Sequence, residues 1–406
     1  MNRMRAIGGA AAGVETRRGV LTRFTAWGGA TVAGALLAAC GTAGGGTPGG
    51  QSAGEARPAK IGTAFTLTGG ASVYGQAQRN AVQLAAEEIN TKNTVPGVKV
   101  DVLYEDDGGD KQPGSNVFQK FINQDRVLAI IGPTLSTVAL AVDPIAQQAG
   151  VPVLGVSNTA TGVTDIGNFI FRNSLTESVV IPNTIKRAKE KLNLQKVALL
   201  YGIDDNFTKS GFDEFKKALD ANAVQILGTP QTFQTTDKDF AAQLTQIKGS
   251  APDALVVSAL IAAAVGIVTQ ARQLVDEKIP IIGGNGFNSP ALMRDAGKAA
   301  EGVVVGAAWH SSSSNPLSQA FIKAYQAKFN APPDQFAAQA YAGLYIVAEA
   351  IKRAGANPTR DGVRRALGEI KGLPTVLGNF SFTANRDADH PPVVQIVRDG
   401  QFELFE

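Results

Sequence analysis

Small polar side chains follow each of two apolar runs in the first half of the chain. Ser136 comes shortly after the run 127–131, and Ser157-Asn158-Thr159 comes directly after the run 151–156. Ser136 occupies an expected helix N-cap position, because apolar residues follow it at helical spacing. The carboxyl ends of neighbouring parallel strands form a crevice, where hydroxyls and free N–H groups bind anions. The stretch predicts half of a carboxylate-binding cleft; the alternative is a simple helix cap and a turn.

Residues that could support catalysis are few. The only two histidines, His310 and His390, fall in different predicted elements, and the single cysteine follows a predicted export signal. These residues provide no His/Cys metal cluster. Gly155-Val-Ser157-Asn-Thr159 begins like a nucleophile elbow but lacks the final glycine. The adjacent acids of Asp106-Asp107 and Asp204-Asp205 favour solvated or capping roles. We therefore predict a protein that is not an enzyme and that has no cofactor and no metal site.

The N-terminal segment has the composition of a targeting sequence. Five Arg and one Glu precede or flank an apolar run from Thr25 to Ala39, which ends in Leu37-Ala-Ala-Cys40. This resembles a bacterial lipoprotein signal, and it predicts a signal peptide over residues 1–39 and lipidation of Cys40. Thr16-Arg-Arg-Gly-Val-Leu21 resembles a twin-arginine export motif, although an ordinary basic segment explains it equally well. The Gly/Ser/Thr/Pro-rich residues up to Pro58 complete a predicted tether over 40–58.

The charge balance excludes nucleic acid as a partner. The whole chain carries a formal charge of +3, but residues 1–39 contribute five Arg against one Glu, so the remainder carries about −1. No later apolar run has the length of a membrane span. We therefore expect an exported protein on the outer face of the cell membrane, in the periplasm or at the cell surface, attached through its lipid anchor only.

From Lys60 onward, predicted strands and helices alternate, and the pattern restarts after Glu177. This order predicts the α/β class, with two doubly wound parallel-sheet lobes joined by a multi-strand hinge. We expect lobe 1 to comprise residues 59–177 and 309–382, and lobe 2 residues 178–308 and 383–406. Such an arrangement can close over a ligand.

Several short motifs, taken in order, resemble one known family. Over roughly residues 59–400 the chain resembles the periplasmic solute-binding proteins of the branched-chain amino-acid (leucine/isoleucine/valine) type. The resemblance implies a type I periplasmic binding protein, a monomer that binds a small molecule and delivers it to the permease and ATPase subunits of an ABC importer. The motifs are Thr68-Gly-Gly-Ala-Ser-Val-Tyr-Gly75, Glu105-Asp-Asp, Ile131-Gly-Pro with Ser136, Gly150-Val-Pro-Val with Ser157 and Thr159, Phe171-Arg172, Asp204-Asp-Asn-Phe207 before Ser210-Gly211, and Ala340-Tyr-Ala-Gly-Leu.

The resemblance also implies roles for particular residues. Ser136, together with the segment Ser157-Asn158-Thr159, would hold a ligand carboxylate through charge-assisted hydrogen bonds. Aromatic side chains would surround the apolar part of the ligand, with core packing as the alternative for each. Trp309 falls near a passage between the lobes and would either line the cleft or pack in the hinge. The side chains expected around the apolar part are Tyr74, Phe207, Phe336 and Leu260, the last at a position that is usually aromatic in amino-acid binders.

The chain departs from the family pattern at Asn285, where amino-acid binders of this type place an acid on the ligand ammonium. Losing a charged partner for a desolvated ammonium costs ~3 kcal/mol or more. Either Glu177 or Asp205 supplies that charge, or the ligand carries no ammonium. Hydrophobic amino acids, related or aromatic carboxylates, amides and ureas stay open as ligands. The main functional hypothesis is a receptor for an importer; the alternatives are a sensor for a membrane signalling protein and, with least support, a surface hydrolase.

Overall fold

The computed structural model describes residues 56–406, so the predicted signal peptide, Cys40 and most of the predicted tether lie outside the described residues. The tether was expected to reach Pro58, but strand β1 (Arg57–Phe65) already includes Arg57 and Pro58. These two residues extend the parallel ladder with β2 (Val98–Asp106), where Arg57 pairs with Val98. The folded part of the chain therefore begins slightly earlier than the composition indicates.

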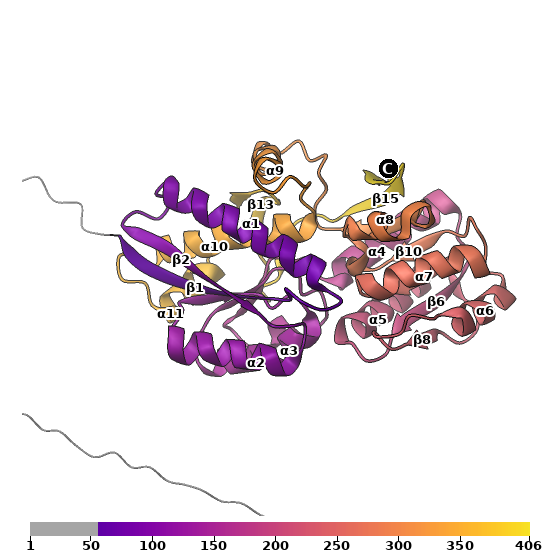
Figure 1. Cartoon of the computed structure of the whole chain (residues 1–406), viewed down its shortest axis with the longest axis horizontal. Helices are drawn as coiled ribbons and strands as arrows, with labels where there is room; N and C mark the ends of the chain where they lie inside the picture. Colours follow the sequence, from indigo (N-terminus) through magenta and orange to yellow (C-terminus); the bar gives the residue numbers. More distant parts are fainter. Residues whose placement is uncertain (1–55) are drawn as a thin grey trace, which may run out of the picture. The chain divides into compact units, whose positions relative to one another are not determined.

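The first sheet has five parallel strands, each followed by a helix or a helical turn (Figure 1). Its three shortest strands are buried along their whole length, which explains their continuous apolar runs. The strand order across the sheet is β2, β1, β3 (Ala129–Ile131), β4 (Val153–Gly155) and β5 (Ile170–Arg172).

Helices cover both faces of the first sheet (Figure 1). Helices α1 (Ser72–Thr91) and α10 (Gln335–Arg353) pack against one face, although more than 200 residues separate them in the chain. The other face is covered by α2 (Lys111–Gln119), a π-helical extension (Lys120–Asp125) and α3 (Ser136–Gln148). The later elements that complete the cluster around α1 and α10 are α9 (Pro316–Phe329), α11 (Arg360–Gly368) and a small antiparallel sheet of β12 (Leu373–Thr375), β13 (Gly378–Phe382) and β14 (Ala388–Asp389).

The second sheet has eight strands and is mixed, whereas the sequence predicted a parallel lobe. Its two last strands are antiparallel and form a hairpin through Asp399 and Gly400, both with positive φ. The strands β8 and β16 were not predicted. The order is β16 (Gln401–Leu404), β15 (Val393–Arg398), β11 (Val303–Ala307), β10 (Ile281–Gly283), β9 (Ala254–Ser258), β6 (Lys196–Gly202) and β7 (Gln225–Ile226), and β8 (Gln231–Phe233) also pairs with β6.

Helices also cover both faces of the second sheet (Figure 1). Its short helix α8 was missed by sequence reasoning, because six residues are too few to show helical periodicity. One face carries α6 (Ala241–Ser250), α7 (Ile261–Leu274) and α8 (Ala291–Ala296), and the other carries α4 (Glu177–Leu192) and α5 (Asn206–Ala221). The remaining short turns are 3-10 helices over Thr164–Ile166, Asn285–Phe287 and Gly297–Ala300.

The described chain passes between the two sheet regions three times. It leaves the first sheet after β5 and enters α4, returns after β11 to α9, and leaves again after β14 to β15. The sequence predicted several such passages, and the boundaries of the two lobes remain a prediction. Among residues 56–406, no helix combines the length and the hydrophobicity that a membrane crossing requires.

Candidate ligand-binding site

A small cavity of about 20 Å³ lies where loops from the carboxyl ends of strands in both sheets meet. This is where open α/β sheets bind ligands. The cavity has room for little more than one water molecule. Seven side chains proposed from the sequence line it together, namely Tyr74, Ser136, Ser157, Phe207, Leu260, Asn285 and Phe336. Sequence reasoning missed the other three lining residues, Thr134, Leu135 and Gly286.

A closed set of hydrogen bonds forms the polar wall on the side of the first sheet. The Ser157 hydroxyl donates to the Thr134 carbonyl oxygen at 2.6 Å and accepts from the Gln78 amide at 2.8 Å. The Thr134 hydroxyl donates to the Gln78 side-chain oxygen at 2.7 Å and accepts from the Thr66 N–H at 2.9 Å. We call Gln78, Thr134 and Ser157 the paired network. Gln78 was not predicted, although it lies one helical turn after Tyr74 on the buried face of α1.

The structure corrects the predicted role of Ser136. It is the first residue of α3 and not its N-cap; that position belongs to Leu135, whose backbone is extended. The Ser136 hydroxyl instead accepts from the N–H groups of Thr159 at 3.2 Å and Ala160 at 3.3 Å. A hydroxyl has one donor and two acceptor positions. The Ser136 O–H therefore remains able to donate to a carboxylate at the N-terminus of α3.

Asn158 and Thr159 lie behind the cavity and do not line it. The Asn158 amide donates to the Pro133 carbonyl oxygen at 2.9 Å. The Thr159 hydroxyl is buried and has no hydrogen-bond partner among residues 56–406. The Arg172 guanidinium donates to the carbonyl oxygens of Asn158 at 3.3 Å and Ala160 at 2.6 Å. These contacts fix the loop after β4 in place.

Tyr74 and Phe336 come from the helices of the first sheet but pack among apolar residues of the second. Their ring centroids lie 4.4 Å apart. The Tyr74 hydroxyl donates to the Gly286 carbonyl oxygen and accepts from the Ile261 N–H at 2.8 Å. Burial raises the pKa of Tyr74 well above its usual range, so this phenol is neutral. Tyr74 therefore links the two sheet regions directly across the cavity.

The opposite wall is largely apolar, formed by Phe207, Leu260 and Gly286. Its polar member is Asn285, whose side-chain oxygen accepts from the Gln335 amide at 2.6 Å. The Asn285 side-chain oxygen thus forms a hydrogen bond between the two sheet regions. An acidic residue at this position would carry its negative charge on the same group. Within the described chain, neither wall places an ionised carboxylate on the cavity lining.

The three residues proposed as possible contacts lie off the lining. Asp205 caps α5 by accepting from the Thr208 N–H at 2.9 Å, in agreement with the predicted capping role. Trp309 packs against Phe321 with ring centroids 6.3 Å apart and lies outside the cavity lining. Glu177 is 1% exposed, and its backbone N–H donates to the Thr159 carbonyl oxygen at 3.1 Å.

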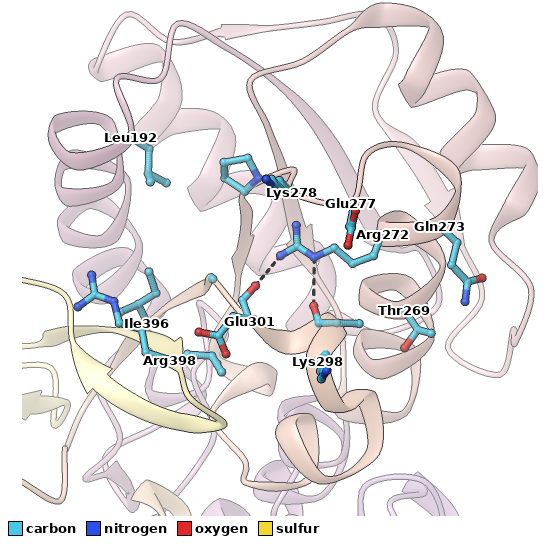
Figure 2. A pocket seen from close by; sticks show the side chains of 14 residues that line it. Leu192, Thr269, Arg272, Gln273, Glu277, Lys278, Lys298, Glu301, Ile396 and Arg398 are labelled. Carbon is cyan, nitrogen blue, oxygen red and sulfur yellow. Dashed lines mark hydrogen bonds between the residues drawn. The ribbon is translucent and has the colours of Figure 1, made fainter.

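A larger hollow of about 610 Å³ lies at the amino ends of β10 and β11, near Pro280 and Gly302 (Figure 2). The Arg272 guanidinium donates to the carbonyl oxygens of Ala299 at 3.1 Å and Glu301 at 2.7 Å, and Figure 2 labels Arg272 and Glu301 and draws hydrogen bonds as dashed lines. The guanidinium is thus engaged in holding loops together. Because ligands of parallel sheets bind at the carboxyl ends of the strands, we assign this hollow a structural role.

Comparison with known proteins identifies the family. The family model described as periplasmic binding protein matches residues 58–401, and the chain belongs to this family. A Leu/Ile/Val-binding protein of Rhizobium johnstonii, BraC3, is 30% identical over 338 residues, which cover 80% of this chain and 88% of that protein. This confirms the predicted resemblance, the type I fold and the prediction of a binding protein rather than an enzyme.

Two solved structures are similar over nearly their whole length. The branched-chain amino-acid transporter substrate-binding protein LivJ of Streptococcus pneumoniae, in complex with isoleucine, has a TM-score of 0.80 and 29% identity, and the match covers 86% of this chain and 98% of that one. A solute-binding protein of an ABC transporter from Rhodopseudomonas palustris, in complex with 3,4-dihydroxybenzoic acid, has a TM-score of 0.77 and 26% identity, covering 85% and 95%. Members of this family act outside the cytoplasm.

Proposed function

We propose that the chain is a solute-binding lipoprotein that captures a small carboxylate-bearing or amide-bearing molecule and delivers it to an ABC importer. The ligand class is a branched-chain or other hydrophobic amino acid, or a related acid. The observation that carries this proposal is one cavity with hydroxyl groups on the wall of the first sheet and aromatic side chains around it.

The polar wall supports recognition of a carboxylate. The Ser136 O–H is free to donate, and α3, a helix of 13 residues, directs its N-terminal end at the same place. Hydrogen bonds to a charged group in a dry site are about twice as strong as neutral ones, and the helix dipole favours an anion there. The aromatic rings of Tyr74, Phe207 and Phe336 supply the apolar surface that a hydrophobic side chain needs.

Contacts across the cavity support a closing motion of two lobes. Besides the Tyr74 bonds, the Thr137 hydroxyl donates to the Asp205 carboxylate, and the Thr161 N–H donates to the Ser210 hydroxyl at 3.0 Å. A cavity of about 20 Å³ is far smaller than the roughly 300 Å³ or more of typical ligand sites. Ligand access therefore requires the two walls to separate, as in hinged binding proteins.

Anchoring and partners complete the proposal. Lipidation at Cys40 would hold the protein on the outer face of the cell membrane. The Gly-rich segment between Cys40 and the start of β1 at Arg57 would serve as the tether. Permease and ATPase subunits would be the protein partners, and the receptor would act as a monomer.

A thermal-shift screen of the exported protein tests the proposal. The panel contains leucine, isoleucine, valine and phenylalanine, their 2-oxo acids, aromatic acids and amides, because a ligand that binds the native state raises the melting temperature by mass action. We expect at least one carboxylate to stabilise the protein. Ser136→Ala should weaken that ligand by ~1.5–3 kcal/mol, the value of a hydrogen bond to a charged group.

The matched control is Ser314→Ala, which removes an exposed hydroxyl from the loop before α9 and should leave affinity unchanged. If no compound raises the melting temperature, the proposed function is wrong. If Ser136→Ala binds the best carboxylate as tightly as the wild type does, the carboxylate site has been placed on the wrong wall.

A further inference from the structure

Buried polar atoms without partners gather beside the cavity, around Gly211 of α5. Neither carboxylate oxygen of Glu177 nor the hydroxyl of Ser258 has a hydrogen-bond partner within the described chain, although these residues are only 1% and 2% exposed. Both groups lie against α5. A Cβ placed on Gly211 would lie 2.3 Å from the Ser258 hydroxyl oxygen and 2.8 Å from Glu177 Oε1. We call Glu177, Ser258 and the adjoining Gly211 the unpaired pocket.

The charged groups around Glu177 do not neutralise it. Asp205 and Glu214, both on or next to α5, are acids, and Glu214 pairs with Lys217 at 2.7 Å. Arg172 is the nearby cation, but its guanidinium is engaged with Asp387 and with backbone carbonyl oxygens. A buried carboxylate without a partner costs several kcal/mol. The chain therefore retains a buried acid that its own described residues leave uncompensated.

The electrostatics agree with this geometry. Burial raises the pKa of Glu177 well above its usual range; the Ser210 hydroxyl opposes this rise, and the acids Asp205 and Glu214 add to it. Ser210 lies near the carboxylate but makes no hydrogen bond of normal geometry to it, and its hydroxyl oxygen accepts from the Thr161 N–H at 3.0 Å. Ionisation of Glu177 is thus unfavourable until a cationic group arrives.

The unpaired pocket adjoins the cavity through two elements. Phe207, which lines the cavity, lies one helical turn before Gly211 on α5. Thr159 connects the two sites through its backbone, because its N–H donates to Ser136 and its carbonyl oxygen accepts from the Glu177 N–H at 3.1 Å. The backbone of Thr159 therefore connects Ser136, at the proposed carboxylate site, to the first residue of α4, Glu177.

We propose that the unpaired pocket receives the ammonium group of the ligand, with Glu177 as its counter-ion and the Ser258 hydroxyl as a second acceptor. The ligand class is then an α-amino acid, held by its carboxylate at Ser136 and by its ammonium at Glu177. Glu177 would supply the negative charge that the family pattern places at position 285, where this chain has the neutral Asn285. This inference rests on the proposed function, since it assigns the second polar end of the same ligand.

The test compares amino acids with their 2-oxo acids, which keep the carboxylate and the side chain but lack the ammonium. Isothermal calorimetry on the exported protein measures leucine, isoleucine, valine and phenylalanine against the matched oxo acids. Glu177→Gln keeps the shape of the side chain and should weaken the best amino acid at least about 10-fold, as expected for a lost charged hydrogen bond. Binding of the oxo acid should change less than about 3-fold.

A second variant and a proton measurement keep the test independent of folding defects. Ser258→Ala removes the second acceptor without adding volume and should also weaken the amino acid selectively. Wild-type binding of the amino acid should release protons, which calorimetry detects as a dependence on buffer ionisation enthalpy, and Glu177→Gln should abolish that release. The control is Glu190→Gln, an exposed acid on the same helix, which should change neither quantity.

The outcomes separate the two proposals. If Glu177→Gln binds the amino acid as tightly as the wild type, or if the wild type prefers an oxo acid or an aromatic acid, the inference is overturned while the proposed function stands. If the wild type binds no member of the panel, both are overturned.

Discussion

Two buried polar regions lie near the cavity, one on its lining and one behind it, and they differ in whether their hydrogen bonds are satisfied. In the paired network, the side chains of Gln78, Thr134 and Ser157 bond to one another and to backbone groups. In the unpaired pocket, Glu177 and Ser258 are as deeply buried but find no partner within residues 56–406. Burial alone therefore does not distinguish a structural polar cluster from a candidate binding site.

The difference has an energetic meaning. A satisfied network stabilises the native state whether or not ligand is present, and removing one member leaves the others unpaired. A buried polar group without a hydrogen-bond partner destabilises the ligand-free protein. It forms a favourable interaction only when a ligand supplies the partner. The comparison predicts that substitutions in the two regions change stability in opposite directions, as expected where function and stability conflict.

The largest effect should come from Gln78→Leu. This change leaves the Thr134 hydroxyl without its acceptor and the Ser157 hydroxyl without its donor. We expect the free energy of unfolding to fall by ~2–4 kcal/mol, from the penalty for unsatisfied buried groups. Urea unfolding measures it. Gln76→Leu, at an exposed position on the same helix, should stay within ~0.5 kcal/mol of the wild type. Equal effects at the two positions would contradict the importance of the paired network.

Glu177→Gln should act in the opposite direction. Replacing an uncompensated buried carboxylate by a neutral amide of the same shape should raise the free energy of unfolding of the ligand-free protein at neutral pH, because burial raises the pKa of Glu177 and makes its ionised form unfavourable in the folded state. Urea unfolding in the absence of ligand measures this change. A loss of stability would mean that Glu177 already has a favourable partner in the free protein.

The stability gain of Glu177→Gln should depend on pH. The folded-state pKa of Glu177 lies well above the ordinary value of 4.5, so the folded protein binds the proton more tightly than the unfolded chain does. The wild type should therefore lose stability as the pH rises above about 4.5, until the folded-state pKa is passed. Glu177→Gln should lack this decline, so the two proteins should converge near pH 4.5. Parallel stability curves across that range would contradict the raised pKa.

The smallest effect should come from Ser258→Ala. Its hydroxyl has no partner to lose, so we expect a change of about 0.5 kcal/mol or less, towards greater stability. The same chemical change in the paired network, Ser157→Ala, removes two hydrogen bonds and should lower the free energy of unfolding by ~1–2 kcal/mol. Thermal or urea unfolding of both variants measures the two changes in the free energy of unfolding. If Ser258→Ala lowered the free energy of unfolding as much as Ser157→Ala does, the comparison would be contradicted.

Much of the fold followed from the sequence because parallel sheets impose a regular alternation. Buried strands such as β9 and the periodic helices between them were predicted close to their observed bounds. At the antiparallel end of the second sheet, β15 was predicted at its observed bounds but β16 was missed, although Asp399-Gly400 is a strong hairpin signal. The helix α8 and the strand β8 were too short to show a period.

The candidate site was partly predictable for a different reason. The resemblance placed seven side chains that the structure brings to one cavity, from Tyr74 to Phe336; their role in binding stays a prediction. It could not show that Ser136 accepts two backbone N–H groups, because those bonds depend on how β4 lies beside β3. Nor could it show that Glu177 lacks a partner within residues 56–406, since that depends on every neighbour that packs around it.

The position of Trp309 gives the protein an intrinsic optical probe. The chain has two tryptophans, and Trp27 lies in the segment that we expect the export machinery to remove. Trp309 follows β11 of the second sheet and packs in the apolar cluster of the first, with its indole N–H bonded to the Ser318 hydroxyl at 2.9 Å. A mature receptor would thus carry a single tryptophan at a passage between the two sheets, and its emission would follow their relative motion without any added label.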